Sequence, residues 1–540
     1  MSPPFAVVYL DYAATTPVDP AVVQAMSACL GTDGDFGNAA SVAHPFGRRA
    51  AARIETARAQ VAALIRCTPD EILFTSGATE SANLAMLGIA RANADRGRHL
   101  VTSRIEHKAV LDSCRRLEKE GFSVTYLAPD RLGRVASQSV RAALRSDTVL
   151  VSIMVANNEI GVLQDVEAIG AVCREREIMF HTDAAQAVGK VPFNVRDLPI
   201  DVASFTAHKL YGPKGVGGLY VRRAARALLQ PIHFGGGQER GLRPGTLATH
   251  QIVGFGAACE LAGRLQAAEA ERLATLRDLL WEGIAALGGV HLNGEGATRL
   301  PGILNVSFED VEGESLVTGL VEVAASTGSA CNSASNEPSY VLRALGRDSQ
   351  LAQSSLRFSL GRFTTAADVE TAAKAVRREV RRLRAVAPGW EGPVSSAGKA
   401  ANPAAGELLG PLARQYFLTL PQAGVFPDPS ESVQPEGTSP EGTAKVLTGE
   451  AGSQGQGTWL RFHLLVVDNI VKDARFQSYG CPHTLAVAAW LAGQLPGRHC
   501  EALVPGVPAD WARVLEVPIE KLGRLLVVED ALRACLRQGP

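Results

Sequence analysis

The chain has 540 residues, of which 46% are hydrophobic and 20% charged, with a formal net charge of -1. One hydrophobic core rarely serves so long a chain, so two or more domains are expected, and the balanced charge argues against direct binding of nucleic acid. No apolar run reaches the roughly 18 residues that span a membrane. The nine cysteines form no CxxC pair, and the first residues carry no charged signal-peptide region, which predicts a reducing, cytoplasmic setting.

Strand-like and helix-like segments alternate up to about residue 385. The strand-like runs "DEILFTSG" (70–77), "HLVTSRIEH" (99–107) and "TVLVSIMVANNE" (148–159) are each followed by a helix-like run. This order predicts an α/β fold with a largely parallel sheet and helices on both of its faces. Ligands of such folds bind at the carboxyl ends of the strands. From about residue 265, long helices rich in Arg, Glu, Ala and Leu and shorter strands predict a smaller α+β domain.

The alternation ends in a segment rich in Pro, Gly, Ser and Ala, which predicts a linker. A similar segment at 427–443 predicts a long loop, and the runs at 458–481 and 482–495 predict a β-hairpin or meander followed by a helix. The expected domains are residues 1–386, a linker at 387–406, and a second domain at 407–540. Within the first of them, we expect a large domain at about 20–260 and a small domain made of 1–19 and 261–386.

Two strand-like runs of the first domain end on residues that carry chemistry. Asp183 ends "IMFHTD", and Lys209 follows "VASFTAH". A carboxylate at a buried strand end is costly unless a cation or hydrogen bonds stabilise it, and a cationic ring nitrogen is such a partner. Lys209 alone would be a solvated turn residue, but beside an Asp and a phosphate site it becomes a candidate Schiff-base amine.

The run "FTSGATESANLAM" places a Gly-rich turn between a strand and a helix that begins near Thr79 and Glu80. Unpaired N–H groups at such a helix start bind phosphate, although a simple capped helix explains the junction equally well when it stands alone. Together with Asp183 and Lys209, the junction predicts a pocket for pyridoxal 5'-phosphate (PLP), a cofactor that acts as an electron sink.

Eight motifs follow one another along residues 8–385: "YLDYAATTPVDPAV", "TSGATESANLA", "EHKAVL", "NNEIGVLQD", "HTDAAQAVGK", "AHKLYGPKGVGGLYVR", "ERGLRPGT" and "STGSACNSASNEPSYVLRALG". In this order they resemble the NifS/IscS-type cysteine desulfurases of the class V aminotransferase family. The resemblance implies a fold-type I PLP-dependent transferase, with a mixed, mostly parallel sheet and a small α+β domain, that acts as a homodimer.

The resemblance also implies a role for individual residues. Lys209 would form the Schiff base with PLP, Asp183 would hold the proton of the pyridine nitrogen, and His107 would stack on the ring and shuttle protons. Gln186 would contact the phenolic oxygen, and Asn158 would lie close to both cofactor and substrate.

Further residues would bind the phosphate and the substrate carboxylate. Arg357 of "LRFSLG" is expected to hold that carboxylate as a bidentate fork. Thr206 stands where the family usually has serine, and its hydroxyl would preserve the phosphate contact. The phosphate binders that the resemblance implies are Ala78, Thr79, Thr206 and His208, with Thr246 reaching the phosphate of the neighbouring subunit.

Cys331 decides the subclass of enzyme. It lies among small residues in "STGSACNSASNEP", a composition that predicts an exposed, mobile loop rather than a core. An aminotransferase needs no thiol there, whereas a desulfurase needs a nucleophile that attacks sulfur. L-cysteine would become L-alanine, and the Cys331 persulfide would pass to a sulfur-acceptor protein for iron–sulfur cluster assembly or other thio-compounds. A selenocysteine lyase or another fold-type I lyase is the alternative within catalysis.

The second domain carries "VKDARFQSYGCPHTLAVAAWL" and "LARQYFLTLPQAGVF". These runs resemble the IscU/NifU N-terminal scaffold domain, so a small α+β domain of that type is expected at about 407–540. Scaffolds of this type hold an iron–sulfur cluster with three cysteines. Only Cys481 has a matching position, because "GSQGQGTWLRF" lacks the first cysteine and Arg524 lies near the third. The usual cluster is therefore doubtful.

The role of this domain stays open between several alternatives. The domain could keep its fold only as a docking surface, or Cys481 could accept sulfur from Cys331 as a tethered relay thiol. Cys481, His483, His499 and Cys500 could instead form a different N/S metal site, although their spacing matches no standard zinc pattern. The alternative outside catalysis is an assembly protein whose second domain builds or docks an iron–sulfur cluster.

Overall fold

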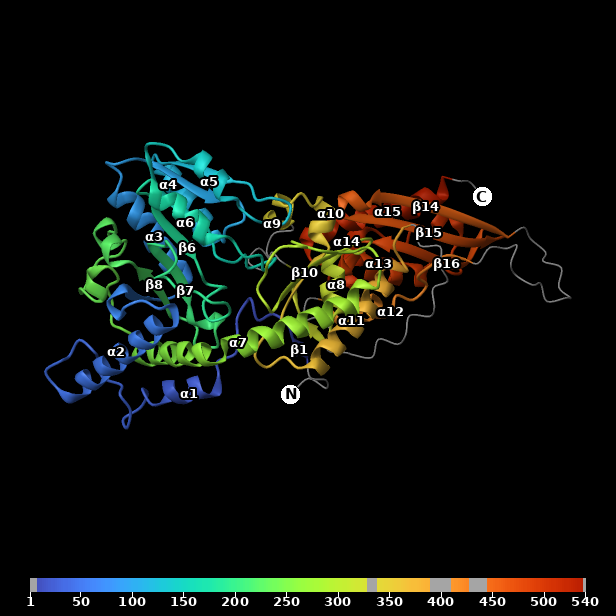
Figure 1. The fold of residues 1–540 in the computed structure, drawn as a ribbon. Helices are drawn as coiled ribbons and strands as arrows, with labels where there is room; N and C mark the ends of the chain where they lie inside the picture. The colour runs from blue at the N-terminus through green and yellow to red at the C-terminus, as the bar shows by residue number, and fades with distance from the viewer. Residues whose placement is uncertain (1–6, 328–337, 389–408, 427–443, 538–540) are drawn as a thin grey trace.

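The computed structural model describes residues 7–327, 338–388, 409–426 and 444–537. The predicted loop at 427–443 and Cys331 lie outside the described residues, as does nearly all of the predicted linker. Figure 1 shows three regions in a row: a large sheet with its helices, a smaller sheet in the middle, and the C-terminal sheet at the far end. Within the described ranges, no helix combines the length and the apolar character that crossing a membrane requires.

A seven-stranded sheet in the order β2-β8-β7-β6-β5-β3-β4 forms the centre of the large domain. β8 is antiparallel to both of its neighbours, and the other pairs are parallel, so the predicted mixed, mostly parallel sheet is confirmed. Its strands are β2 (Ile72–Thr75), β3 (His99–Ser103), β4 (Ser123–Leu127), β5 (Thr148–Ser152), β6 (Met179–Asp183), β7 (Val202–Thr206) and β8 (Gly217–Val221).

Helices cover both faces of this sheet, as the alternating pattern predicted. In β3, Leu100 packs into the apolar cluster with α3 and α4, while Val101 packs into the cluster on the opposite face with α2, α6 and α7, because successive side chains of a strand point to opposite faces. The helices are α1 (Pro20–Ser27), α2 (Pro45–Ile65), α3 (Ala78–Ala92), α4 (Lys108–Lys119), α5 (Ser137–Ala143), α6 (Val166–Glu175) and α7 (Thr249–Ala285).

The 37-residue helix α7 joins the large domain to the small domain, packing on α1 and α2 at one end and on α11 at the other. The expected boundary near residue 260 therefore falls inside a continuous helix. The small domain has a four-stranded antiparallel sheet in the order β12-β13-β10-β9, and β1 pairs with β11 beside it. Its elements are β1 (Val8–Tyr9), β9 (Val290–Leu292), β10 (Ile303–Phe308), α8 (Gly313–Gly319), β11 (Val323–Ala324), β12 (Ser326–Thr327), α9 (Tyr340–Ala344), α10 (Ser349–Gln353), β13 (Ser355–Ser359) and α11 (Ala366–Arg384).

The C-terminal domain is a three-stranded antiparallel sheet, β14-β15-β16, with helices packed on it. β15 and β16 form the predicted hairpin, and Asp468 and Asn469 at its tip both have positive φ, as a two-residue turn of this kind requires. The elements are α12 (Pro411–Thr419), β14 (Lys445–Ser453), β15 (Thr458–Val467), β16 (Ile470–Tyr479), α13 (Pro482–Gln494), α14 (Pro508–Val514) and α15 (Leu522–Leu536).

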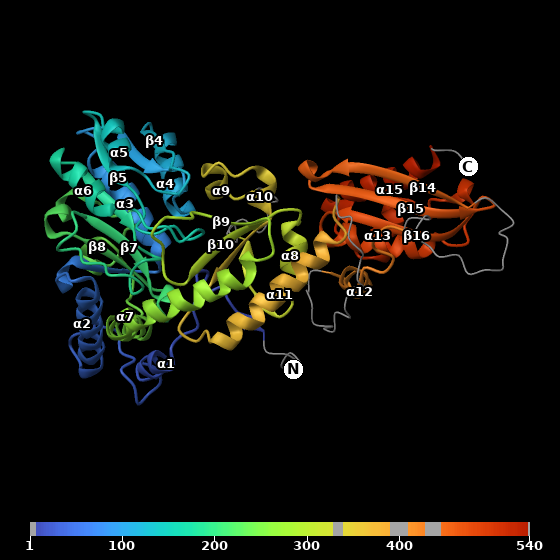
Figure 2. The same ribbon diagram turned by 45° about the vertical axis from the view of Figure 1, so that its right-hand side comes forward.

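The C-terminal domain is docked on the small domain, beside α8 and α11 (Figure 2). One apolar cluster runs without interruption from the small sheet into the C-terminal sheet, and it includes Leu316 of α8 and Phe417 of α12. The Arg382 guanidinium lies 4.7 Å from the centre of the Phe417 ring and donates to the Phe417 carbonyl oxygen at 2.8 Å. Burial of apolar surface therefore holds the two domains together.

Candidate active site

The two strand ends singled out in the sequence lie side by side in the sheet. β6 ends at Asp183, and its parallel neighbour β7 is followed directly by the short 3-10 helix Ala207–Lys209. Asp183 and Lys209 both line a cavity of about 600 Å³ at the carboxyl edge of the large sheet. This edge is where ligands of mostly parallel sheets bind. Ten of the predicted site residues line this cavity: Ala78, Thr79, His107, Asn158, Asp183, Gln186, Thr206, His208, Lys209 and Arg357.

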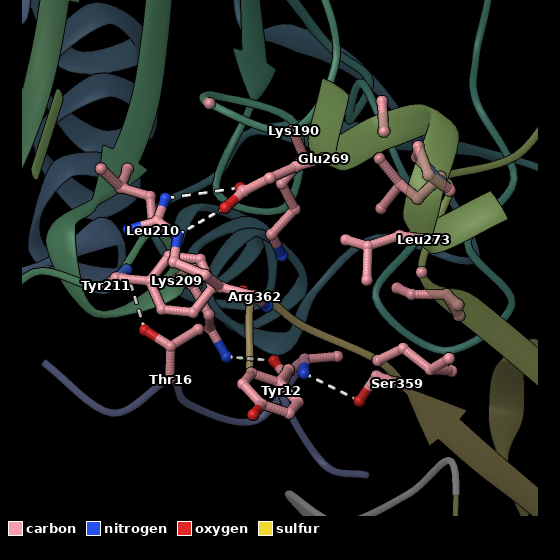
Figure 3. Close-up of a pocket in the computed structure, with 18 of the residues that line it drawn as sticks. Tyr12, Thr16, Lys190, Lys209, Leu210, Tyr211, Glu269, Leu273, Ser359 and Arg362 are labelled. Carbon is pink, nitrogen blue, oxygen red and sulfur yellow. Dashed lines mark hydrogen bonds and ion pairs between the residues drawn. The ribbon is translucent and has the colours of Figure 1, made fainter. Parts of the chain in front are cut away.

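The ε-amine of Lys209 is held by backbone oxygens of the N-terminal segment. Nζ donates to the carbonyl oxygens of Ala13 and Ala14, at 2.6 Å for Ala14. Lys209 also lines a second, smaller cavity of about 40 Å³, which Figure 3 shows with Tyr12, Tyr211 and Arg362 around it. The lysine therefore stands in the wall between two cavities, with its amine fixed by hydrogen bonds.

Asp183 is buried, and only 7% of its surface is exposed. Burial raises the pKa of its carboxyl group, and the nearby His107 and Lys209 act against that rise. The Ala185 N–H donates to its Oδ1 at 2.9 Å. A cationic nitrogen in the cavity would complete the stabilisation of this carboxylate.

Two histidines of the cavity have defined hydrogen bonds. His107 caps the start of α4, where its Nδ1 accepts from the Ala109 N–H at 3.1 Å, so a neutral ring carries its proton on Nε2. His208 Nδ1 lies 3.1 Å from Thr15 Oγ1. Burial, together with Lys209 and other nearby lysines, lowers the pKa of His208 to about 4, so this ring is neutral at pH 7.

The start of α3 has the features of a phosphate cradle. Gly77 occupies its N-cap and offers no side-chain hydrogen bond, and it lines the cavity with Ala78 and Thr79. The N–H groups of the first turn can therefore bind an anion. The turn lies so close to β8 that a Cβ on Gly217 would be 2.6 Å from the Gly77 Cα, which explains the glycine there.

Two residues that line the cavity each have a buried polar atom without a partner among the described residues. They are Asn158 Oδ1 and Arg357 Nε. Arg357 is otherwise held by Asp11 Oδ1 at 2.8 Å, by Ser326 Oγ at 2.9 Å and by the Asn158 carbonyl oxygen at 2.8 Å. Unpaired buried polar atoms are costly, so a ligand with complementary groups is expected. The donor set fits PLP together with an amino acid.

Comparison with known proteins agrees with this chemistry. The Aminotransferase class-V family matches residues 8–371, and the NifU-like N terminal domain matches residues 431–538. The cysteine desulfurase IscS of Pectobacterium atrosepticum is 55% identical over 384 residues, which is 71% of this chain and 95% of that protein. The cysteine desulfurase IscS of Aeromonas hydrophila has the same identity and coverage.

The chain belongs to the class-V aminotransferases and is a cysteine desulfurase. Its cofactor is PLP. Among solved structures, a NIFS-like protein is 36% identical with a TM-score of 0.65 and covers 70% of this chain and 100% of its own. The structure of SspA in complex with cysteine is 41% identical with a TM-score of 0.60 and covers 66% of this chain and 99% of its own. These similarities confirm the predicted fold class of the desulfurase.

Three predicted site residues lie outside this cavity or outside the described residues. Thr246 is exposed and does not line the cavity of its own chain. Cys331 lies outside the described residues. Cys481 lies in the C-terminal domain, where its side chain is fully buried.

The sequence analysis missed several charged residues in or beside the cavity. Glu159 lines the cavity, and Glu106 lies beside it with one buried oxygen that has no partner among the described residues. Lys190 donates to Gln186 Oε1 at 2.8 Å, and burial lowers its pKa to about 7. A signal was present in the sequence, because Glu106 and Glu159 each stand next to a predicted site residue in a segment that follows a strand.

In the C-terminal domain, Cys481 caps α13, and its Sγ lies 3.3 Å from Thr484 Oγ1. Cys481 and His483 lie at the start of this helix, whereas His499 and Cys500 lie beyond its end, about 20 Å away for thirteen helical residues. No group of three or more His, Cys, Asp or Glu residues in the described ranges could hold a metal ion. The predicted alternative of a four-residue N/S metal site is therefore wrong.

Proposed function

We propose that this desulfurase converts L-cysteine to L-alanine in the 600 Å³ cavity and that Cys331 receives the sulfur. The observation that carries the proposal is the convergence of a fixed lysine amine, a buried carboxylate and an arginine with an unpaired Nε on one cavity. An amine, a ring-nitrogen partner and a carboxylate receptor are the three groups that PLP chemistry on an amino acid requires.

PLP, when bound, supplies an electron sink for charge that develops on the substrate α-carbon. Asp183 would hold its ring nitrogen and Gln186 its phenolic oxygen. The Gln186 amide is oriented for this by its own bonds, because Nε2 donates to the Ala13 carbonyl oxygen at 2.9 Å and Oε1 accepts from Lys190. The phosphate would lie against the start of α3, Thr206 and the neutral His208.

Protons are moved by two groups of the chain. Lys209 Nζ, oriented by the carbonyl oxygens of Ala13 and Ala14, removes the α-proton of the substrate. His107 exchanges protons through Nε2, because its Nδ1 is occupied by the Ala109 N–H. Arg357 binds the substrate carboxylate, which gives its Nε a partner.

The sulfur moves in one displacement. The Cys331 thiolate forms a bond to the substrate sulfur while the substrate Cβ–S bond breaks, and the electron pair of that bond stays on Cβ. Cβ then takes up a proton and becomes a methyl group, and the α-carbon regains the proton that Lys209 removed, which gives alanine. The sulfur remains on Cys331 as a persulfide and passes to a sulfur-acceptor protein for iron–sulfur cluster assembly.

The substitution Cys331→Ala tests this assignment. The variant is expected to keep the visible absorbance of bound PLP and to lose alanine formation from L-cysteine. Cys29→Ala, which changes a buried cysteine outside the cavity, is the matched control and should keep both. Full turnover by Cys331→Ala would remove this thiol from the reaction. Parallel assays with selenocysteine distinguish this function from that of a selenocysteine lyase.

We also infer that the desulfurase acts as a homodimer. Thr246 is exposed and lies outside the cavity of its own chain, so a phosphate contact through its hydroxyl requires a second copy. Light scattering measures the oligomeric state directly. Thr246→Ala should weaken PLP binding in a dimer, and an unchanged PLP affinity would contradict the contact.

For the C-terminal domain, we infer a docked partner domain rather than a cluster scaffold. Ser315 Oγ of α8 donates to the Gly480 carbonyl oxygen at 2.8 Å, next to the fully buried Cys481. Arg524 lies near the position of the family's third cysteine. It interacts with both Cys481 and Glu312, and Glu312 belongs to the small domain. Sulfur transfer to Cys481 therefore requires this interface to open, and the direct acceptor is a separate protein.

Mass spectrometry of the intact protein after cysteine addition tests this inference. A persulfide is expected on Cys331 and none on Cys481, because a buried thiol cannot meet the sulfur donor. A persulfide on Cys481 under single-turnover conditions would support the relay role instead. Anaerobic reconstitution of the full chain with iron and sulfide should produce no visible cluster on the C-terminal domain.

A further inference from the structure

Glu159 is a buried carboxyl group in the wall of the substrate cavity that the proposed reaction does not use. It follows Asn158, whose Oδ1 is unpaired, and only 3% of its surface is exposed. Its backbone is fixed on both sides, because its N–H donates to Asn157 Oδ1 at 2.9 Å and its carbonyl oxygen accepts from Asn305 Nδ2 at 3.1 Å. The carboxylate is thus held at one place in the cavity wall.

The side chain of Glu159 binds the start of α9. Ser339 Oγ donates to Glu159 Oε2 at 2.5 Å, and the same Oγ accepts from the Leu342 N–H at 3.2 Å as the N-cap of that helix. The hydroxyl has one proton, so accepting from the helix leaves that proton for Glu159. Ser339 is itself 3% exposed, so water does not compete freely for this bond.

A second bond joins the same helix start to the other side of the cavity. The Tyr340 hydroxyl donates to the Glu106 carbonyl oxygen at 2.7 Å, and Tyr340 lines the cavity. Two consecutive residues at the start of α9 are therefore tied to the segments that carry His107 and Asn158. In the sequence, Ser339 comes eight positions after Cys331.

We propose that Glu159 is a positioning residue of the desulfurase: through Ser339 it fixes the start of α9 against the Asn158 segment and so sets the wall of the substrate cavity. The inference rests on the proposed function, because it assigns this wall a role in the conversion of L-cysteine. Glu159 acts through Ser339 and Asn158 and takes no part in bond making.

The charge of Glu159 governs the strength of this anchor. A hydroxyl binds an ionised carboxylate roughly twice as strongly as a neutral acceptor. The charged groups that face Glu159 are Arg357 on β13 and His107 at the start of α4, and both favour its ionised form. Burial raises the pKa of Glu159 to about 7 in spite of them and of the Ser339 hydrogen bond. The anchor is therefore strong above about pH 7 and weakens as the pH falls.

The substitution Ser339→Ala tests the anchor, and Ser339→Thr, which keeps the hydroxyl, is the matched control. Ser339→Ala should lower kcat by about tenfold or more, as expected for the loss of a hydrogen bond to a charged group. It should also remove the acid limb near pH 7 from the kcat–pH profile, because the ionisation of Glu159 can no longer strengthen a bond that is absent. Ser339→Thr should behave like the wild type.

A second control separates anchoring from titration. Tyr340→Phe removes the bond to the Glu106 carbonyl oxygen without touching Glu159, so it should lower kcat while the acid limb stays in place. An acid limb that stays near pH 7 in Ser339→Ala would overturn the role of Glu159. Unchanged kcat in Ser339→Ala would overturn it as well.

Infrared titration of the protein provides a readout that does not depend on activity. A protonated-carboxyl band that disappears in Glu159→Gln should titrate near pH 7 in the wild type and at higher pH in Ser339→Ala. If the wild type forms no alanine, the proposed function fails, and this titration still decides whether Ser339 controls Glu159. An unshifted band in Ser339→Ala overturns the inference.

Discussion

The reactive groups of the desulfurase and the thiol of the C-terminal domain lie in different surroundings. Around the large cavity, burial raises the pKa of Asp183, Glu106 and Glu159 and lowers that of Lys190. Such groups are unfavourable on their own and become useful when a ligand pairs with them. At the start of α13, by contrast, Cys481 has a hydroxyl and an arginine beside it, and an apolar interface closes over it.

Under our proposal, the C-terminal domain keeps its fold without a cluster site on it. The C-terminal domain matches the NifU-like N terminal domain, and an apolar core stabilises its sheet and helices. A cluster site needs several ligands at once, and we propose that the two missing cysteines leave this domain without one. In the desulfurase, all the groups that converge on the cavity are present together.

The largest expected effect compares one substitution in each region. Lys209→Ala should lower alanine formation by about a thousandfold or more, because both the Schiff-base amine and the proton acceptor are lost. Cys481→Ala, measured in the same assay, should leave alanine formation unchanged. A similar loss in both variants would show that the C-terminal thiol is part of the catalytic cycle.

The next prediction concerns the interface between the two regions. Phe417→Ala removes a fully buried ring over which Arg382 packs, at a cost of about 3–5 kcal/mol. The C-terminal domain should then open from α11, and Cys481 should become accessible to alkylation, as mass spectrometry measures. Alanine formation should persist. Continued protection of Cys481 would mean that other contacts hold the interface closed.

Lys190, a partly buried lysine that lines the smaller cavity, gives a pH-dependent prediction. The folded pKa of Lys190, about 7, lies below the ordinary value of 10.5, so the unfolded chain binds more protons between these values and stability rises with pH across this window. Lys190→Met should remove this slope. Urea unfolding at pH 7 and pH 9 measures it, and an equal slope in both proteins would show that Lys190 is solvated.

The smallest effect is expected from the ion pair across the interface. Lys521 Nζ lies 2.8 Å from Glu314 Oε2, with the carboxylate about one third exposed. Such a pair contributes about 1 kcal/mol or less, so Lys521→Ala should only slightly increase the alkylation rate of Cys481. A double-mutant cycle with Glu314→Ala isolates the pair, and an effect as large as that of Phe417→Ala would reverse the expected order.

Much of the fold followed from local patterns. The predicted strand-like runs contain β2, β3 and β5, and the hairpin and the helix after Cys481 are present where they were expected. The runs were longer than the strands, because they also contain loop residues that border the strands, such as Ile153–Glu159 after β5. The continuity of α7 through residue 260 was missed, since no local signal marks a helix that serves two cores.

The sequence by itself identified the reactive residues at the strand ends. Asp183 ends one strand-like run and Lys209 follows another, and both lie in the ordered motifs. Only the tertiary structure decided which distant groups meet. The Ser339–Glu159 bond joins residues 180 positions apart, and the Arg357–Asp11 pair joins residues 346 positions apart. The burial of Cys481 beside α8 also depends on a contact between distant residues, the bond from Ser315 to Gly480. Such contacts depend on how elements pack, and packing follows from the shapes of whole surfaces rather than from any short run of residues.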